Sequence, residues 1–280
     1  MDPSSEVIWN KNYKINNWNI YGNSIAGLKT SFYISDLNIL LDGGYQNFYR
    51  PDNIFITHLH ADHIANLHLT VLENNNNKVF TNIYCPLESI RYLENFLKSF
   101  FFCNYNTEKI NFNKIFKIHG MVPGQKKEII LNKKKFIVEA IKSNHVVKTL
   151  SYGFNFVSKK LKEEYKDMNG KELASLKKSG IDIVNEVTSG VLLFVGDTDK
   201  DIFNDSSFYN YKNIIIECTF LDDNDIHLSV ERKHLHWKFL EKIVKDNQNI
   251  NFYLIHISPR YLKNYMSYIK NNYDNLHFLY

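Results

Sequence analysis

The 280-residue chain lacks the features that would place it in a membrane or in an oxidising compartment. No apolar run approaches the roughly 20 residues that a membrane-spanning helix needs, and the first six residues lack the basic and apolar regions of a signal peptide. Only three cysteines occur, and their wide spacing in apolar or β-prone surroundings favours buried, reduced thiols over a disulfide framework: Cys85, Cys103 and Cys218. We therefore expect a soluble, intracellular protein of the cytoplasm, with the nucleus as an alternative.

The chain also lacks an evident linker between two domains. A chain of this length can bury one large core. Its short apolar strands recur regularly, which favours a single α/β domain over residues 1–280. The expected architecture is an αββα sandwich, in which two mixed β-sheets are flanked by helices.

Positive charge predominates only in short segments of the sequence. The formal net charge is +4, but lysines cluster at 126–127, 133–135, 159–162 and 177–178. Such clusters would steer a polyanion toward the surface. Lysine runs in a lysine-rich sequence are equally typical of solvated faces, so charge alone leaves both readings open.

Potential metal ligands are concentrated in one short segment. The apolar, β-prone segment 53–57 precedes them, and a helix is expected over 64–72. Alternation along the strand end points the first two histidines the same way, and the next two ligands follow at the turn into the helix. The four residues are His58, His60, Asp62 and His63. Each alone could be a surface or capping residue, whereas together they predict half of a two-metal site.

A four-ligand loop cannot complete two metal sites, so further ligands should follow later strands. Three candidates come directly after apolar runs: His145, Asp197 and His256. Open α/β sheets gather their binding sites at the carboxyl ends of strands. Each residue alone would more often be structural, but together with the first segment they predict a complete dinuclear centre.

The order of these motifs resembles the metallo-β-lactamase fold, and further segments narrow the resemblance to ribonuclease Z, nearest to its short plant-type form. The matching segments are Ser24–Gly27, Leu40–Gly44, Gly196–Thr198, Glu217–Asp223, Lys233–His236, Ile255–Tyr261, Lys160–Tyr165 and Gly170–Gly180. The likeness runs from about Tyr21 to Tyr261. It implies an endonuclease that removes the 3′ trailer of precursor tRNA.

The resemblance also implies roles for the candidate ligands. One zinc would be held by His58, His60 and His145, the other by Asp62, His63 and His256, and Asp197 would bridge the two. The metals would supply hydroxide at neutral pH to attack the phosphodiester, and Asp62 would also orient or deprotonate that water. Manganese or iron could replace zinc, since both accept the same ligand types.

Three further residues receive roles from the resemblance. The leaving ribose oxygen needs a proton, which His234 would supply while Glu217 steadies the imidazole. Without the resemblance, His234 could equally pack on a helix expected over 228–243, and Glu217 could be an ordinary acid at a strand end. Asp42, at the end of an apolar strand, would support a ligand histidine and would not bind metal itself.

The chain departs from the family pattern at two places. Residues 157–190 predict a short helical insertion in place of the long, glycine- and proline-rich arm with which many ribonuclease Z enzymes grip tRNA. Lys159, Lys160 and Lys162 on this insertion, or a second subunit of a homodimer, could take over the grip. The Pro-x-Lys-x-Arg-Asn-type loop of the bacterial and long forms is also missing, so trailer specificity cannot be predicted.

Three functions remain under consideration. The first is a zinc-dependent endoribonuclease acting on precursor tRNA. The second is another dinuclear hydrolase of the same fold, acting on a small phosphodiester or thioester. The third is a scaffold that binds nucleic acid without catalysis, which the seven retained ligands disfavour. A steep salt dependence would separate the first from the second.

Overall fold

We describe residues 11–46, 48–107, 109–269 and 272–279 of a computed structural model of the chain. The first seven-stranded sheet has the order β1-β2-β3-β4-β5-β6-β7. Its strands β1 to β4 are antiparallel neighbours and β4 to β7 are parallel. The strands are β1 (Lys11–Ile15), β2 (Trp18–Ile25), β3 (Lys29–Ile34), β4 (Ile39–Leu41), β5 (Asn53–Phe55), β6 (Thr81–Pro86) and β7 (Phe116–Met121).

The second seven-stranded sheet has the order β14-β13-β12-β11-β10-β9-β8. It is antiparallel from β8 to β11 and parallel from β11 to β14. The strands are β8 (Lys126–Leu131), β9 (Lys134–Ser143), β10 (Thr149–Leu161), β11 (Val184–Phe194), β12 (Asn213–Glu217), β13 (Asn251–Ile255) and β14 (Leu276–Phe278). Both sheets are therefore mixed, as the sequence predicts.

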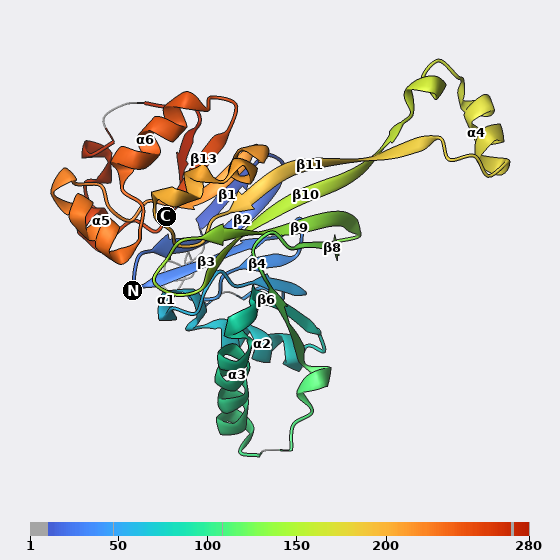
Figure 1. The fold of residues 1–280 in the computed structure, drawn as a ribbon. Helices are drawn as coiled ribbons and strands as arrows, with labels where there is room; N and C mark the ends of the chain where they lie inside the picture. Colours follow the sequence, from blue (N-terminus) through green and yellow to red (C-terminus); the bar gives the residue numbers. More distant parts are fainter. Residues whose placement is uncertain (1–10, 47, 108, 270–271, 280) are drawn as a thin grey trace, which may run out of the picture.

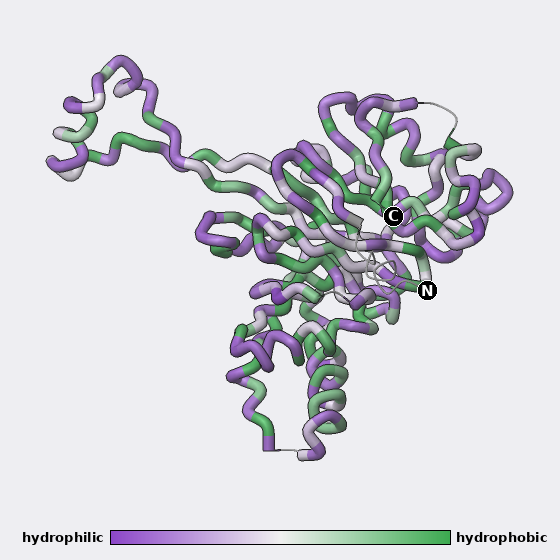
Figure 2. Tube along the Cα trace, turned by 180° about the vertical axis from the view of Figure 1, so that it is seen from behind, coloured by the Kyte–Doolittle hydropathy of each residue, from purple (hydrophilic) through white to green (hydrophobic). Residues whose placement is uncertain are grey.

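The main core lies between the two sheets. Strand alternation sorts the side chains: Leu41 and Phe55 face the second sheet, whereas their neighbours Leu40 and Ile54 face outward. Tyr152 packs its ring edge against Phe55 at a centroid distance of 5.3 Å across this interface. Figure 2 shows hydrophobic residues concentrated in these crossing strands. The sheets meet because each buries one apolar face against the other.

Helices cover the outer faces of the sheets, so the predicted αββα sandwich is confirmed (Figure 1). The helices α2 and α3 pack on the first sheet, and α6 packs on the second. The α-helices are α1 (Ala61–Ile64), α2 (Leu67–Asn76), α3 (Ile90–Tyr105), α4 (Gly170–Lys178), α5 (Ile226–Arg232) and α6 (Trp237–Asp246).

Two helix predictions were wrong in detail. The helix expected over 64–72 is divided into α1 and α2, and the helix expected over 228–243 is divided into α5 and α6. The second break occurs at Lys233, which has a left-handed φ of 53° and ends α5. Glycine is the usual residue at such a position, so the sequence carried little sign of this break.

The segment 157–190 differs most from the expectation of a short helical insertion in place of an arm. Here β10 and β11 continue as an antiparallel hairpin beyond the sheet, paired from Val157 with Thr188 to Leu161 with Val184. Figure 1 shows this hairpin protruding from the body, with α4 at its tip. We call residues 157–188 the arm. Its β-branched residues favour extended pairing over helix.

The cysteines and helices of the described residues bear on two further expectations. All three cysteines are free, as expected, but only Cys85 and Cys218 are buried; Cys103 is exposed on α3, which corrects the expectation for that residue. Within the described ranges, none of the helices combines the length and apolar character that crossing a bilayer would require.

Candidate metal centre

The loop after β5 carries the first four candidate ligands. It passes from Thr57 through the two histidines into α1, whose first turn contains Asp62 and His63. Glycines at the end of β4 allow this close packing: a Cβ at Gly44 would lie 1.7 Å from the backbone oxygen of Asp62. The loop that carries these four candidate ligands, which we call the ligand loop, therefore packs directly against the residues that follow β4.

The later candidate ligands follow strands of the second sheet. His145 lies between β9 and β10, Asp197 follows β11, and His256 follows β13. All three are buried. The structure therefore brings together all seven residues that the sequence singled out, from both sheets.

The carboxylate of Asp197 lies at the middle of the group. Its Oδ2 is 3.6 Å from the Nε2 of His58 and 4.0 Å from the Nε2 of His145. The same oxygen is 3.5 Å from the Nε2 of His63 and 3.5 Å from the Nε2 of His256. A single oxygen thus faces imidazoles of both ligand sets.

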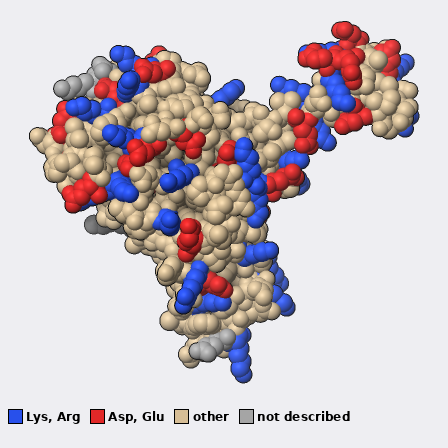
Figure 3. Space-filling view, in the orientation of Figure 1, with Lys and Arg blue, Asp and Glu red and all other residues tan. Residues whose placement is uncertain are grey.

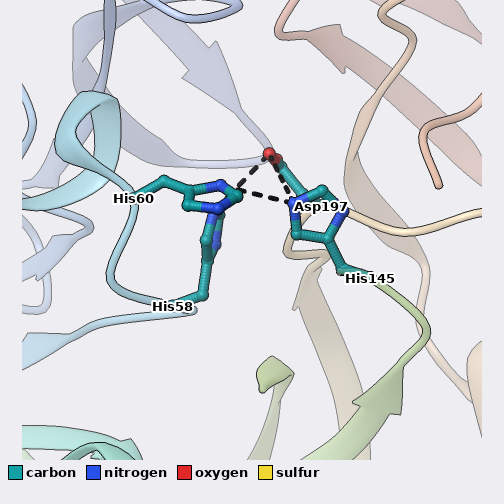
Figure 4. Close-up of side chains that lie close together, drawn as sticks. All are labelled: His58, His60, His145 and Asp197. Carbon is teal, nitrogen blue, oxygen red and sulfur yellow. Dashed lines mark hydrogen bonds and ion pairs between the residues drawn. The ribbon is translucent and has the colours of Figure 1, made fainter. Parts of the chain in front are cut away.

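The first ligand set consists of His58, His60, His145 and Asp197, whose candidate ligand atoms lie within 4.8 Å of one another. Figure 4 shows the three rings converging on the Asp197 carboxylate. The Nε2 of His145 is 3.3 Å from the Nδ1 of His60. Burial lowers the pKa of His58, His60 and His145, which favours the neutral imidazole that binds metals.

The second ligand set consists of Asp62, His63 and His256. The Nε2 atoms of the two histidines are 3.4 Å apart, and Asp62 Oδ2 is 3.2 Å from His256 Nε2. Burial would raise the pKa of Asp62, but the hydrogen bond from His256 and the charges of the two histidines lower it to about 2. The carboxylate is therefore ionised, as a metal ligand must be.

In two rings of the first set, a hydrogen bond on the far side fixes the atom that faces the centre. The carbonyl of Lys233 can only accept, so His145 donates to it through Nδ1 at 3.0 Å. The Thr57 hydroxyl donates to a carboxylate and so accepts from His58 Nδ1 at 3.0 Å. In both neutral rings, Nε2 then carries a lone pair directed at the centre.

The resulting donor set fits metal ions. His58 Nε2 is buried without a hydrogen-bond partner, an arrangement that is costly unless a ligand satisfies it. The Nε2 of His256 also faces the centre, and its Nδ1 lies 2.9 Å from Thr219 Oγ1, which donates to the Glu217 carboxylate at 2.6 Å. Imidazole nitrogens with carboxylate oxygens are the ligands that zinc and other first-row metals accept. The His and Asp groups are therefore able to bind metal ions.

Asp42 contacts both the candidate ligand His63 and the backbone of the loop after β5. Its Oδ2 lies 2.8 Å from His63 Nδ1, and its Oδ1 accepts the backbone N–H of Thr57 at 2.7 Å. Burial raises the pKa of Asp42, against the opposing effect of His63. Burial alone would lower the pKa of His63. The carboxylates of Asp197 and Asp42 outweigh burial and raise this pKa well above the usual range. The position therefore favours a positive charge, whether as a proton or as a metal ion.

Glu217, which is buried, and His234, which is partly buried, form a pair beside the candidate ligands. Glu217 Oε1 lies 2.9 Å from His234 Nδ1, and its carboxylate also accepts from the Thr198 backbone N–H and the Thr219 hydroxyl. Burial opposes the charged imidazolium, yet the Glu217 carboxylate raises the pKa of His234 to about 9. With Nδ1 held in this way, the Nε2 of His234 is the atom available to a bound molecule.

A cavity of about 310 Å³ opens onto this arrangement. It is lined by candidate ligands together with His234 and two arginines to which the sequence reasoning gave no role, Arg232 and Arg260. Guanidinium groups recognise phosphate well. Arg260 belongs to the segment Ile255–Tyr261, which resembles the family. Its ion pair with Asp225 at 3.0 Å cannot be predicted from that segment alone.

The lysines singled out for RNA binding lie on the arm, away from the ligands. Lys159 and Lys160 are exposed on β10, and Lys162 directly follows that strand and is half-buried. Seven lysines and six acidic residues share the arm. Figure 3 shows a prominent acidic patch at the arm's end, with basic side chains nearer the body. Any polyanion contact is therefore expected near the body and not at the tip.

Comparisons with known proteins identify relatives of this chain. The family model described as anti-Pycsar protein Apyc1 matches residues 36–185, more than half of the chain. The chain is 28% identical to tRNase Z TRZ1 of Arabidopsis thaliana, over 90% of this chain and 89% of that protein. It is 30% identical to ribonuclease Z of Borrelia duttonii, over 75% of this chain and 70% of that protein.

Solved structures agree on the fold. The metallo-β-lactamase-fold protein YhfI of Bacillus subtilis superposes with a TM-score of 0.61 at 15% identity, covering 93% of this chain and 95% of that one. The short form of human tRNase Z gives 0.57 at 16% identity, covering 92% and 93%. The chain therefore belongs to the family described by the Apyc1 model and to the ribonuclease Z family, which consists of metal-dependent hydrolases with the metallo-β-lactamase fold.

Proposed function

We propose that the protein is a zinc-dependent endoribonuclease that removes the 3′ trailer of precursor tRNA. The observation that carries the proposal is the position of Asp197 Oδ2 within 4.0 Å of five imidazole nitrogens, four from candidate ligands and one from His234, which also pairs with Glu217. Relatives named tRNase Z and ribonuclease Z support the choice of substrate.

The proposed ligand roles follow the two sets described above. His58, His60 and His145 would hold one zinc, Asp62, His63 and His256 the other, and Asp197 would bridge them. When bound, the two ions would supply an activated water at neutral pH and positive charge at the scissile phosphate. Asp62 would orient that water, since its Oδ2 is fixed by the Gly27 backbone N–H at 2.8 Å.

His234 would complete the reaction by giving its Nε2 proton to the leaving ribose oxygen. Glu217 positions the ring by holding Nδ1 and stabilises its protonated form. In this scheme water adds to phosphorus, the bond from phosphorus to the 3′-oxygen breaks, and the phosphate stays on the trailer. Such positioned acid catalysis typically contributes 10²- to 10⁴-fold.

Partners and compartment are part of the proposal. Lys159, Lys160 and Lys162 would contact tRNA phosphates from the arm, and two copies of the chain would form a homodimer, which light scattering can test. The free thiols are consistent with a reducing compartment, so we place the enzyme in the cytoplasm.

Cleavage of an end-labelled precursor tRNA tests the function. The wild type is compared with Asp62→Ala and His234→Ala, each with and without a chelator. We expect a cut beside the discriminator base that needs metal and both residues. Metal content separates the roles: Asp62→Ala should lower it, whereas His234→Ala should retain it while losing about 10²-fold or more in kcat.

A small phosphodiester is the second candidate substrate, favoured by the modest cavity of about 310 Å³. The salt dependence separates the two. Cleavage of tRNA should weaken steeply with salt, whereas turnover of an aryl phosphodiester should depend on it only shallowly. Turnover of the diester without any cut in precursor tRNA would favour the second candidate.

A further inference from the structure

A second hollow lies beside the metal centre, along the same edge of the first sheet. It has a volume of about 600 Å³, within the range of ligand-binding pockets. Pro86 and Met121 contribute the carboxyl ends of β6 and β7 to it. Because β6 is the neighbour of β5, whose end leads into the ligand loop, this hollow continues the edge on which the centre sits.

The loop between β9 and β10 forms the opposite wall and connects the hollow to the centre. The loop contains the candidate ligand His145, which lines the hollow. We call this hollow the β6–β10 groove. A chain lying in it would pass along the loop that carries this candidate ligand.

The groove combines cationic and apolar groups in the manner of a nucleotide site. Lys142 and Lys148 are exposed at its rim, suited to phosphates. Val146 and Val147 are 57% and 39% exposed, so their side chains can pack against a base. A surface that binds only protein would not need these two lysines. Their position beside a centre that we propose cleaves phosphodiesters favours a nucleotide as the occupant.

One acidic residue opposes this charge. Glu88 also lines the groove, and its Oε1 is 3.9 Å from Lys148 Nζ. At that distance and exposure the ion pair is weak. An incoming phosphate can therefore replace Glu88 as the partner of Lys148, and removal of the Glu88 charge should strengthen binding of a polyanion.

The chemistry of the proposed reaction decides which part of the substrate lies here. The leaving 3′-oxygen belongs to the tRNA, and its proton donor His234 lines the other cavity with Arg232 and Arg260. The tRNA end therefore occupies that cavity. The trailer, which keeps the phosphate, must leave the centre by another route, and the β6–β10 groove begins at His145.

We propose that the β6–β10 groove binds the first nucleotides of the single-stranded trailer, with Lys142 and Lys148 on the phosphates and Val146 and Val147 against a base. This inference rests on the proposed function, which it deepens by assigning the trailer its own site. The enzyme should then distinguish trailers by length up to the extent of the groove.

The test compares precursor tRNAs with trailers of one and six nucleotides. In the double variant Lys142→Ala/Lys148→Ala, we expect KM for the six-nucleotide trailer to rise about tenfold relative to that for the one-nucleotide trailer. The salt slope should become shallower by about 1.4, since each single-strand phosphate contact contributes about 0.7. Glu88→Gln should shift the KM ratio in the opposite direction.

A matched control and a binding assay make the result decisive. Lys98→Ala removes another lysine that is ion-paired with a glutamate, on α3, and should leave the KM ratio unchanged. A 5′-phosphorylated hexanucleotide with a 3′ fluorophore should bind the wild type, and bind the double-lysine variant about tenfold more weakly. Equal KM ratios, or equal hexanucleotide binding, would overturn the inference.

The binding assay separates the two levels of the proposal. If the wild type binds the hexanucleotide through the two lysines but leaves precursor tRNA uncut, the groove is a nucleotide site and the tRNA function fails. If precursor tRNA is cut but the lysine and glutamate variants change neither measurement, the function holds and the groove assignment fails.

Discussion

The Oδ2 of Asp42 lies 2.8 Å from the Nδ1 of His63, at the buried junction between the end of β4 and the ligand loop. Asp42 also accepts the Thr57 backbone N–H, so one carboxylate fixes both the loop and a ring that faces the centre. It has a left-handed φ of 56°, which non-glycine residues adopt at a cost. This backbone conformation accompanies the contact that holds the ring of the candidate ligand His63.

Replacement of Asp42 tests this orientation. In Asp42→Asn, the amide retains the shape but loses the charge that raises the pKa and basicity of His63. We expect metal affinity to fall by about 10- to 100-fold, the usual effect of losing such a supporting carboxylate. Competition with a chromophoric chelator measures it. Asp36→Asn, which removes a carboxylate bonded to Asn19 outside the centre, should leave affinity unchanged; equal losses in both would contradict the orienting role.

Gly44 provides a second test, of packing. A Cβ at this position would lie 1.7 Å from the Asp62 oxygen, so Gly44→Ala must displace the ligand loop or the end of β4. We expect a loss of about 1–3 kcal/mol in the free energy of unfolding, typical of overpacking, together with reduced metal content. Gly170→Ala, where a Cβ would meet nothing within 4 Å, is the matched control. Urea denaturation that ranked the two variants equally would refute the packing argument.

Removal of the arm tests its part in RNA binding. Val157 is paired with Thr188, so an Asn-Gly turn joining these residues can close the hairpin without the arm. We expect the shortened protein to keep its cooperative unfolding and its turnover of an aryl phosphodiester. Its KM for precursor tRNA should rise by about tenfold, with a shallower salt dependence, because Lys159, Lys160 and Lys162 are lost with the arm. An unchanged KM would show that the tRNA is held elsewhere.

His119 predicts a pH dependence of stability. Burial, with the charges of Lys127 and Lys117, lowers the pKa of His119 to about 4, and its ring accepts from Lys127 Nζ at 3.1 Å. Because the unfolded chain binds the proton near pH 6.5, the stabilisation by the neutral ring is complete above pH 6.5 and is lost as the pH falls toward 4. Because the ring is partly exposed, solvent screening reduces the magnitude of this stabilisation.

The variant His119→Gln should therefore show a flatter dependence of the urea midpoint on pH between 6.5 and 4 than the wild type. Chelator is kept present throughout, so that metal loss at low pH does not contribute. His227→Gln, at an exposed histidine, serves as the control. A wild-type slope retained in His119→Gln would assign the effect to other groups.

Sequence reasoning predicted the sandwich and the convergence of the ligands because both follow from local patterns. Strand alternation selects the faces of the sheets, and ligand residues directly after apolar strands meet at one edge. His58 and Asp197 are 139 positions apart, yet each was marked by the strand that precedes it. Their exact separation of 3.6 Å depends on the packing of one sheet on the other, which no local pattern encodes.

The arm and the supporting contacts were harder to predict for the same physical reason. Pairing of Leu161 with Val184 joins strands across 22 intervening residues, and nothing in either strand alone specifies the partner. The carbonyl of Lys233 supports His145 only because α5 ends there in a left-handed residue that is not glycine. Backbone groups have no sequence signature, so such contacts appear only in the folded structure.

The centre joins residues that are far apart in the chain, and this has a consequence for protein synthesis. The Nε2 atoms of His63 and His256 are 3.4 Å apart although 193 positions separate them. At 5–20 residues per second, a ribosome needs about 10–40 s to add the second after the first. During that interval the early histidines are exposed to the ions in solution, while Asp197 and His256, which complete the centre, have not yet been made. The complete set of groups that could hold a metal therefore exists only after the final strands of the second sheet have been made.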